Sequence, residues 1–337
     1  MRESVRAAQQ ALAEGRFCKI ICGLGMSDAL VARRMATLYA LAGADALDVA
    51  ADPDVVAAAR AGFDDADRIA GLEGRILVAP ALLISVGLQS DPHVGRALLH
   101  RSICATCAGC SIPSLRLCAE RPLELRAPEC PGCMACIGAC PYGAITVAAA
   151  FDGRGDGVAT ALAAGADGLE LHVGGAAVAD IEQVMTTLMG LIDEGMLLSF
   201  SVGSEVTSTA LVLDQVRWIE AQSHEPTVIQ VEGRPMSGGA DIGRAGPAAA
   251  AAIELAARVT TVVQRTYVQI AGGADHTTHG LCVAAGLACH GIGFGGTARL
   301  AARQVLHAAS VDPKDPVFCE ALAAARALVE SCHRGTG

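Results

Sequence analysis

The chain has 337 residues, and its formal net charge of −10 argues against a nucleic-acid-binding surface. Aromatic residues make up only 3% of the chain, so stacking platforms for single strands are not expected either. The longest uncharged apolar run, Ile76–Leu88, is too short to span a bilayer. The first residues lack the basic-then-apolar order of a signal peptide, and 14 cysteines without such a signal indicate a reducing compartment. We therefore expect a cytoplasmic protein that does not insert into membranes.

The first part of the chain alternates β-like and helical segments. A lead-in helix over residues 1–15 comes first, and Asp28 and Gly43 have the chemistry of a helix start and a helix stop. The expected strands are Cys18–Gly23, Ala46–Ala50 and Ile76–Gly87, and the expected helices are Ala29–Leu41 and Pro53 to about Ala61. This order is typical of a parallel sheet.

The alternation stops between Leu88 and about Phe151 and then resumes. The expected strands are Leu169–Val173, Leu197–Val202, Thr227–Val231, Tyr267–Ala271 and His290–Phe294. The expected helices are Val158–Ala164, Ala177–Ile192, Ser208–Ala221, Pro247 to about Val263, Ala298–Ala309 and Val317–Ser331. Eight strands with helices between them favour a TIM-like (β/α)8 barrel. A doubly wound sheet is the alternative, but no G-x-G-x-x-G follows the first strand.

The interruption divides the chain into three parts. Residues 1–87 would form the first part of the barrel, residues 88–150 an insertion after strand three, and residues 151–337 the remainder of the barrel with the C-terminal helices. Because the insertion leaves the carboxyl end of strand three, it would lie at the face where barrel enzymes place their sites.

The insertion holds eight of the 14 cysteines. Cys130-x2-Cys133-x2-Cys136-x3-Cys140-Pro141 is the spacing by which bacterial ferredoxins hold [4Fe–4S] clusters, and a second triplet lies just upstream. Zinc sites use two separated cysteine pairs and disulfides need an oxidising compartment, so neither fits well. The pattern predicts a ferredoxin-like module with two iron–sulfur clusters.

The fourth cysteine of such a run ligates the other cluster in two-cluster modules. One cluster would therefore be held by Cys104, Cys107, Cys110 and Cys140, and the other by Cys118, Cys130, Cys133 and Cys136. Seven residues separate Cys118 from Cys110 where the pattern has three, and Ala119 follows it in place of proline. The extra residues Ser111–Leu117 could form a benign loop, or they could leave this cluster incompletely ligated, for example as [3Fe–4S].

Two glycine pairs follow the last two expected strands. They would lie at the carboxyl-end face of the barrel, the face from which the insertion leaves. Gly272 and Gly273 follow one strand, and Gly295 and Gly296 follow the other together with Thr297 and Arg299. Such turns let backbone N–H groups approach an anion, so a phosphate or the phosphate of a flavin mononucleotide (FMN) could bind there. The alternative is that the glycines only make tight turns.

Other polar residues have weaker patterns. Asp275, His276 and His279 could bind a metal or act in acid–base chemistry, and Arg234 and Asp241 lie in a glycine-rich loop. Plain hydrogen bonding within the loops is the favoured interpretation of both groups. Glu170 and His172 share one face of an expected strand, and a satisfied core histidine is the favoured interpretation. The remaining cysteines are interpreted as small buried residues: Cys18, Cys22, Cys282, Cys289, Cys319 and Cys332.

Several phrases resemble the light-dependent-period (LdpA) iron–sulfur proteins of cyanobacteria. They are K-I-I-C-G, the stretch Tyr39–Arg60, D-P-H at Asp91, G-R-P-M-S-G at Gly233 and V-Q-I-A-G-G-A-D-H-T at Val268. The resemblance implies two iron–sulfur clusters and redox sensing. The family's role in the circadian clock is not carried over.

Three hypotheses follow. The first is an iron–sulfur protein of electron transfer or redox sensing, which exchanges electrons with a redox partner or with a small-molecule ligand at the barrel mouth. The second is an enzyme, a flavin-dependent oxidoreductase whose clusters supply a cofactor at that mouth. The third is a binding scaffold with structural clusters, and fold alone does not choose between them.

Overall fold

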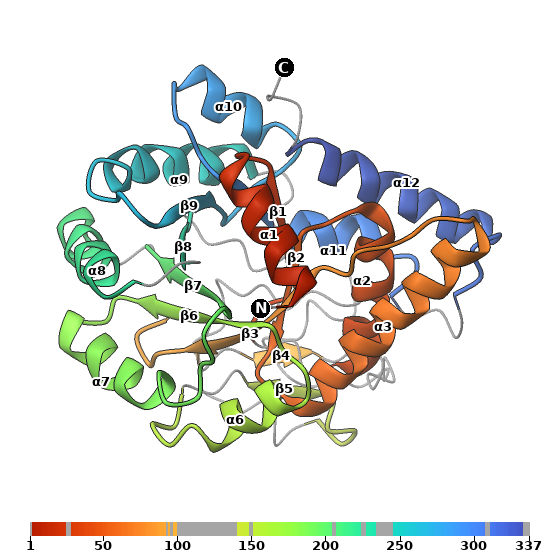
Figure 1. Ribbon diagram of the computed structural model, residues 1–337, viewed down its shortest axis with the longest axis horizontal. Helices are drawn as coiled ribbons and strands as arrows, with labels where there is room; N and C mark the ends of the chain where they lie inside the picture. The colour runs from red at the N-terminus through yellow and green to blue at the C-terminus, as the bar shows by residue number, and fades with distance from the viewer. Residues whose placement is uncertain are drawn as a thin grey trace.

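The computed structural model describes residues 2–24, 28–91, 94, 97–99, 140–147, 151–203, 207–223, 227–233, 245–306 and 311–332. Eight parallel strands form a closed barrel, in which the last strand pairs with the first (Figure 1). The barrel strands are β1 (Phe17–Ile21), β2 (Ala46–Ala50), β3 (Ala81–Gly87), β6 (Gly168–Gly174), β7 (Leu197–Val202), β8 (Thr227–Val231), β9 (Tyr267–Ile270) and β10 (Gly291–Phe294). The expected TIM-like barrel is confirmed.

Helices surround the barrel in the order expected for repeated strand–helix units (Figure 1). They are α1 (Glu3–Ala13), α2 (Ala29–Ala42), α3 (Pro53–Leu72), α6 (Asp156–Ala163), α7 (Val178–Leu188), α8 (Thr209–Gln222), α9 (Ala245–Val259), α10 (Thr278–Ala284), α11 (Gly296–Ala302) and α12 (Pro316–Glu330). Local sequence signals determine where several of these helices begin and end. The Asp28 carboxylate accepts from the backbone of Leu30 and Val31 at the start of α2, and Gly43 ends that helix in the left-handed conformation.

Two boundaries differ from the expectation for physical reasons. Strand β3 begins at Ala81 rather than Ile76, since Pro80 cannot donate to a strand ladder and Ile76 is fully exposed. Helix α3 continues past Ala61 to Leu72. Gly62 lies inside it, where a Cβ atom would clash with the backbone of Arg33 in α2. The glycine therefore permits close packing of two helices and does not end one.

Helix α1 closes the amino-terminal end of the barrel. In Figure 1 it lies across the barrel opening. Its buried residues Val5, Ala8 and Leu12 share an apolar cluster with Phe17 of β1 and Leu83 of β3. The lower part of the barrel interior is thus apolar and sealed by a helix.

The chain leaves the barrel at the carboxyl end of β3 and returns to the same place. The amide of Leu88 donates to the carbonyl of His172 at 3.0 Å, and the amide of Phe151 donates to the carbonyl of Gly87 at 2.8 Å. Between them, β4 (Ala97–Leu99) and β5 (Ile145–Val147) pair antiparallel. Of the eight predicted cluster ligands, the structure describes Cys140, which is half-buried. The other seven lie outside the described residues.

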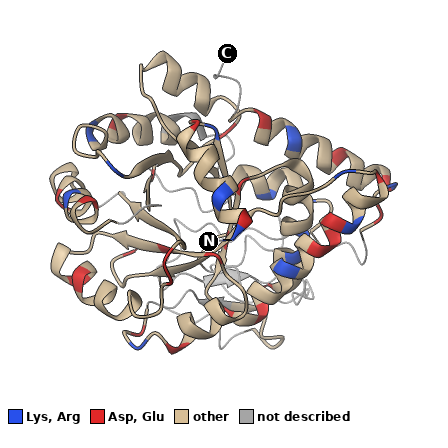
Figure 2. Ribbon diagram, viewed as in Figure 1, with Lys and Arg blue, Asp and Glu red and all other residues tan. Residues whose placement is uncertain are grey.

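Charged residues are distributed over the outer helices. Figure 2 shows positions of both basic and acidic residues along α3 and α12. No helix in the described part of the chain is long and apolar enough to cross a membrane.

Candidate functional site: a buried polar cluster in the barrel

A layer of polar side chains lies above the apolar floor of the barrel. Strand residues alternate between the interior and the outer helices, and parallel pairing sets inward-facing residues beside each other. Ser85 is paired with Glu170, Glu170 with Ser199, and Gln230 with Gln269. These residues, together with Lys19 and Asp48, are at most 2% exposed. We refer to Lys19, Asp48, Ser85, Asp91, Glu170, His172, Ser199, Ser201, Gln230, Glu232 and Gln269 as the buried polar cluster.

Glu170 is at the centre of this cluster. Its Oε2 atom accepts from the Lys19 ammonium group, which also contacts the Ser199 hydroxyl at 3.3 Å. Its Oε1 atom accepts from the side-chain amide of Gln230 at 2.8 Å. Gln230 in turn accepts from Gln269 at 2.7 Å. Five strands therefore contribute to one hydrogen-bonded network, which fixes the orientation of the Glu170 carboxylate.

His172 lies one layer closer to the carboxyl ends of the strands. Its Nε2 atom is 3.3 Å from Glu170 Oε1, and its Nδ1 atom is 3.6 Å from Asp91 Oδ2. Asp91 follows β3, in the first residues of the predicted insertion, and is 4% exposed. The base of that segment therefore contributes a carboxylate to the barrel interior.

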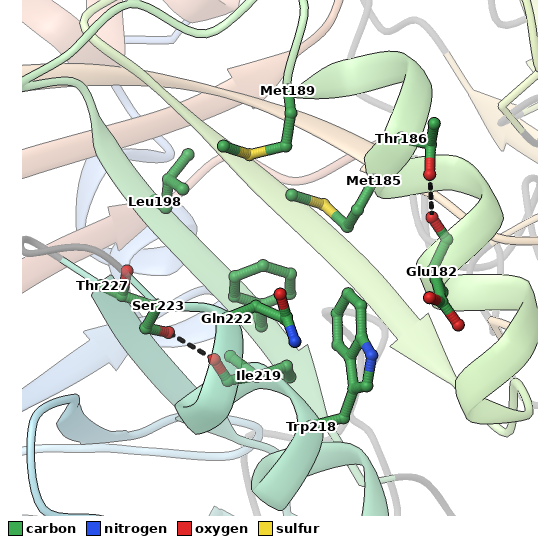
Figure 3. Close-up of a pocket in the computed structure, with 11 residues that line it drawn as sticks. Glu182, Met185, Thr186, Met189, Leu198, Trp218, Ile219, Gln222, Ser223 and Thr227 are labelled. Atoms are coloured by element: carbon green, nitrogen blue, oxygen red, sulfur yellow. Dashed lines mark hydrogen bonds between the residues drawn. The ribbon is translucent and has the colours of Figure 1, made fainter.

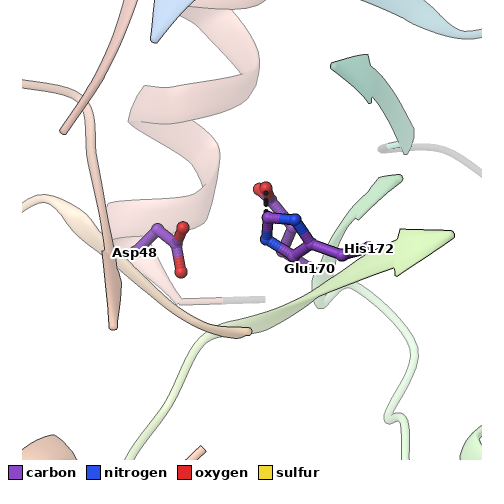
Figure 4. Close-up of side chains that lie close together, drawn as sticks. All are labelled: Asp48, Glu170 and His172. Carbon is purple, nitrogen blue, oxygen red and sulfur yellow. Dashed lines mark ion pairs between the residues drawn. The ribbon is translucent and has the colours of Figure 1, made fainter. Parts of the chain in front are cut away.

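Asp48 faces Glu170 and His172 from β2 (Figure 4). The Ser85 hydroxyl donates to its Oδ1 atom. Its Oδ2 atom has no hydrogen-bond partner within the described residues. One side-chain donor atom from each of Asp48, Glu170 and His172 lies within 4.8 Å of the others, a geometry that could hold a metal ion.

Burial and mutual charge shift the acid–base properties of these three residues. Burial, with the nearby Glu170 carboxylate, raises the pKa of Asp48 to about 7. Burial would also raise the pKa of Glu170, but the Lys19 and His172 charges outweigh it and hold that pKa below its ordinary value. Burial disfavours the charged form of His172, yet Asp91, Glu170 and Asp48 raise its pKa to about 10. At neutral pH an imidazolium therefore lies beside the ionised Glu170 carboxylate.

Sequence reasoning identified part of this cluster. Glu170 and His172 face the interior, and His172 is a buried histidine with charged partners, as the favoured interpretation had it. Its partners are carboxylates, so it belongs to a charged network. Lys19 and Asp48 were missed. The signal was present, because each is a charged residue in the middle of an otherwise apolar strand, F-C-K-I-I or A-L-D-V-A.

The donors of the predicted phosphate site already have backbone acceptors. The Thr297 hydroxyl donates to the Ala274 carbonyl at 2.8 Å, and Arg299 Nη1 donates to the carbonyls of Ile21 and Cys22. Gly272 has a positive φ of 66°, and a Cβ atom there would clash with the backbone of Gly233. Close packing alone thus accounts for this glycine. A phosphate or FMN at the Gly272, Gly273, Gly295 and Gly296 turns stays a prediction.

The histidine-containing loop after β9 does not form a comparable group. Asp275 accepts from the amide and hydroxyl of Thr277 at the start of α10, while His276 is exposed and His279 half-buried. Within the described residues, Asp275, His276 and His279 do not bring three donor atoms together as the barrel residues do. Arg234 and Asp241 lie outside the described residues.

Most of the described cysteines outside the insertion are buried, as predicted. Cys18, Cys22, Cys282 and Cys332 are buried and Cys289 is half-buried, but Cys319 is exposed, so the prediction was wrong there. Cys319 follows the start of α12, and its thiol lies 3.3 Å from the carbonyl of Pro313.

A separate apolar cavity lies outside the barrel, between α7 and α8 (Figure 3). Its volume is about 240 Å³, and its walls include Met185, Met189 and Trp218. The β7 residues Leu198 and Phe200 also line it, whereas Ser199 and Ser201 point to the opposite face of that strand. The cavity therefore has no connection with the buried polar cluster through β7.

Comparison with known proteins places the chain in a family. The model of the family described as "Light dependent period A C-terminal domain" matches residues 161–331. The chain is also 30% identical over 278 residues to "Light dependent period A" of Synechococcus elongatus, an alignment that covers 80% of this chain and 74% of that protein. The chain belongs to the light dependent period A family. The resemblance of its sequence motifs to this family is thereby confirmed.

The chain also has a distant similarity to solved structures of pyruvate carboxylase. It is 10% identical to the carboxyl transferase domain of Rhizobium etli pyruvate carboxylase with pyruvate and biocytin, with a TM-score of 0.40. That match covers 96% of this chain and 50% of the other. For the complete multifunctional pyruvate carboxylase of Rhizobium etli the identity is 10%, the TM-score is 0.38 and the coverage is 96% and 29%. The chain thus spans half or less of these structures.

Proposed function

We propose that this member of the light dependent period A family is an iron–sulfur redox protein with two clusters, acting in electron transfer or redox sensing. The observation that carries the proposal is the ferredoxin spacing Cys130-x2-Cys133-x2-Cys136-x3-Cys140-Pro141, preceded by a second triplet of cysteines. Thiolates at these intervals surround a cuboidal cluster, and two sets of ligands provide for two clusters.

The fold supports a separate module at this point of the chain. The hydrogen bond from Phe151 to Gly87 brings the two ends of residues 88–150 together at the barrel rim. The antiparallel pairing of Leu99 with Ile145 also holds the outgoing and returning parts of the segment side by side. A segment so closed at its base can fold around clusters without disturbing the barrel strands.

The base of the segment also links it to the barrel interior. Asp91 lies 3.6 Å from His172, which lies 3.3 Å from Glu170. With the clusters proposed to be held by the same segment as Asp91, a change of their charge would act on Asp91 and His172 through a medium of low dielectric constant. This would give a redox sensor a physical route to the barrel interior.

The test is anaerobic purification of the full chain, followed by iron and sulfide counting and by EPR of the oxidised and reduced forms. We expect about eight iron atoms per chain for two cuboidal clusters, or about seven if one is [3Fe–4S]. Cys133→Ser should lower the iron count by about half or more, whereas Cys319→Ser, a thiol on the exposed start of α12, should leave it unchanged. Zinc in place of iron would contradict the proposal.

A flavin-dependent oxidoreductase is the second candidate. It is favoured by the buried polar cluster, because charged side chains at the carboxyl half of the strands are where barrel enzymes carry out chemistry. Flavin released by acid in a ratio near one per chain would select this candidate. Iron–sulfur clusters without flavin would select the sensor or electron carrier.

A further inference from the structure

We propose that the barrel interior binds one divalent first-row metal ion through Asp48, Glu170 and His172. These residues come from β2 and β6 of the barrel, so the site is distinct from the predicted cysteine clusters. Their exposed fractions are 0%, 0% and 3%. Their donor atoms lie within 4.8 Å of one another, close to the span of two metal–ligand bonds of about 2.1 Å each.

Each of the three side chains is oriented by a second contact. Ser85 donates to Asp48 Oδ1, Lys19 donates to Glu170 Oε2, and Asp91 lies 3.6 Å from His172 Nδ1. This arrangement leaves Asp48 Oδ2, Glu170 Oε1 and His172 Nε2 as the inner donor atoms. A carboxylate behind the outer nitrogen of a histidine is a recurring feature of metal sites, where it fixes the ring and raises its basicity.

Asp48 Oδ2 provides an independent observation. It is buried, and within the described residues no group donates a hydrogen bond to it. A buried carboxylate oxygen without a donor is costly unless a cation or another ligand satisfies it. Glu170 Oε1 accepts from Gln230 and retains a second lone pair. A cation among the three residues would satisfy both oxygens.

The donor set limits the kind of metal. Two carboxylate oxygens and one imidazole nitrogen suit Mn²⁺, Fe²⁺ or Zn²⁺, whereas soft thiolates select iron–sulfur clusters. The Lys19 ammonium group binds the outer oxygen of Glu170 and so leaves the inner position open. His172 binds as the neutral imidazole, and the proton on Nε2 leaves when the ion enters.

The test is a titration of the anaerobically purified full chain with Mn²⁺, in which EPR measures the free aquo ion. Mn²⁺ prefers oxygen and imidazole ligands to thiolates, so the cysteines compete little for it. We expect one Mn²⁺ per chain. Asp48→Asn should raise the Kd for Mn²⁺ by about 100-fold or more. Ser85→Ala should raise it by about 10- to 100-fold, because it removes the hydroxyl that orients Asp48.

Asp275→Asn is the matched control, because it makes the same change in the loop that carries His276 and His279. It should leave Mn²⁺ affinity unchanged. Iron and sulfide counts on the same samples separate this proposal from the proposed function, since they should be equal in all variants. Trp218 fluorescence reports whether each variant is folded, and if Asp48→Asn does not fold, Ser85→Ala decides.

Three results would overturn the proposal. They are no Mn²⁺ bound by the unsubstituted chain, unchanged affinity in the folded Asp48→Asn or Ser85→Ala chain, and loss of binding in Asp275→Asn. A weaker binding confined to the barrel variants supports it, whatever the iron content.

Discussion

Lys19 has a 1%-exposed side chain in the middle of β1, and its charge is balanced by Glu170, whose side chain is fully buried. Taking two charges out of water is expensive, and their attraction offsets that cost only while both partners are present. The pair also joins β1 to β6 across the barrel. It is therefore a contact in which one substitution has a large effect on stability.

Lys19→Met should lower the free energy of unfolding by about 3 to 5 kcal/mol, because it leaves the Glu170 carboxylate buried without its cation. Denaturant unfolding followed by the fluorescence of Trp218, the single tryptophan, measures the loss. The double variant Lys19→Met/Glu170→Met should recover part of it, since the isolated carboxylate is gone but Gln230 and His172 lose their acceptor.

Arg75→Met is the control for removal of a cation from an ion pair. Arg75 pairs with Glu73 at 2.7 Å, but these side chains are 42% and 52% exposed. Such pairs contribute about 0 to 1 kcal/mol. Equal losses of unfolding free energy in Lys19→Met and Arg75→Met would show that the buried pair contributes no more to stability than an exposed pair.

At the scale of elements, α1 is a closure of the barrel rather than a peripheral helix. Its apolar residues recur at intervals of three and four and face the barrel floor. Contacts with Phe17 and Leu83 remove that floor from water. Helix α1 thus closes the barrel on the amino-terminal side of the buried polar cluster.

Leu12→Ala should destabilise the protein by about 2 to 5 kcal/mol, because it opens a cavity between α1 and the barrel floor. Thermal or denaturant unfolding followed at Trp218 measures the change. Leu72→Ala is the same substitution at the end of α3, where the side chain is 76% exposed, and its effect should stay within about 0.5 kcal/mol. A small loss in both variants would mean that α1 does not seal the barrel.

At the scale of the whole molecule, stability should depend on pH through buried carboxyl groups. Asp45, just before β2, accepts from the amide of Cys18 at 2.8 Å and lies 3.5 Å from Arg16 Nη1, with Glu14 nearby. Burial outweighs these favourable contacts and raises the pKa of Asp45 from 3.8 to about 6. The folded protein therefore holds this proton more tightly than the unfolded chain.

The sign of the effect follows from linkage. The stability that Asp45 contributes is fully present below pH 3.8 and is lost as pH rises through about 6. We expect the free energy of unfolding to fall by up to about 3 kcal/mol over this window on account of Asp45. Asp48, with a pKa of about 7, acts in the same direction at higher pH.

Unfolding measured from pH 4 to pH 7 should therefore show a flatter profile for Asp45→Asn than for the unsubstituted chain. Asp180→Asn, an exposed carboxyl group in the first turn of α7, should run parallel to the unsubstituted chain. Parallel profiles for all three proteins would contradict the assignment to Asp45.

The sequence by itself determined the barrel and the family. Alternating apolar runs and helix caps depend on neighbouring residues, so β2, β7 and β8 have the predicted bounds, and the motifs of the light dependent period A family are contiguous phrases. Boundaries failed where a distant contact intervened. Gly62 permits the packing of α3 on α2, which no local pattern of α3 reveals.

Only the tertiary structure decided which charged residues meet. Lys19, Asp48 and Glu170 lie far apart in the chain, and closure of the barrel brings β1, β2 and β6 around one interior. The burial and the neighbouring charges that shift the pKa values of Asp48 and His172 exist only after closure. Sequence periodicity assigns each residue to a face of its strand, whereas contact between strands depends on the register and closure of the whole sheet.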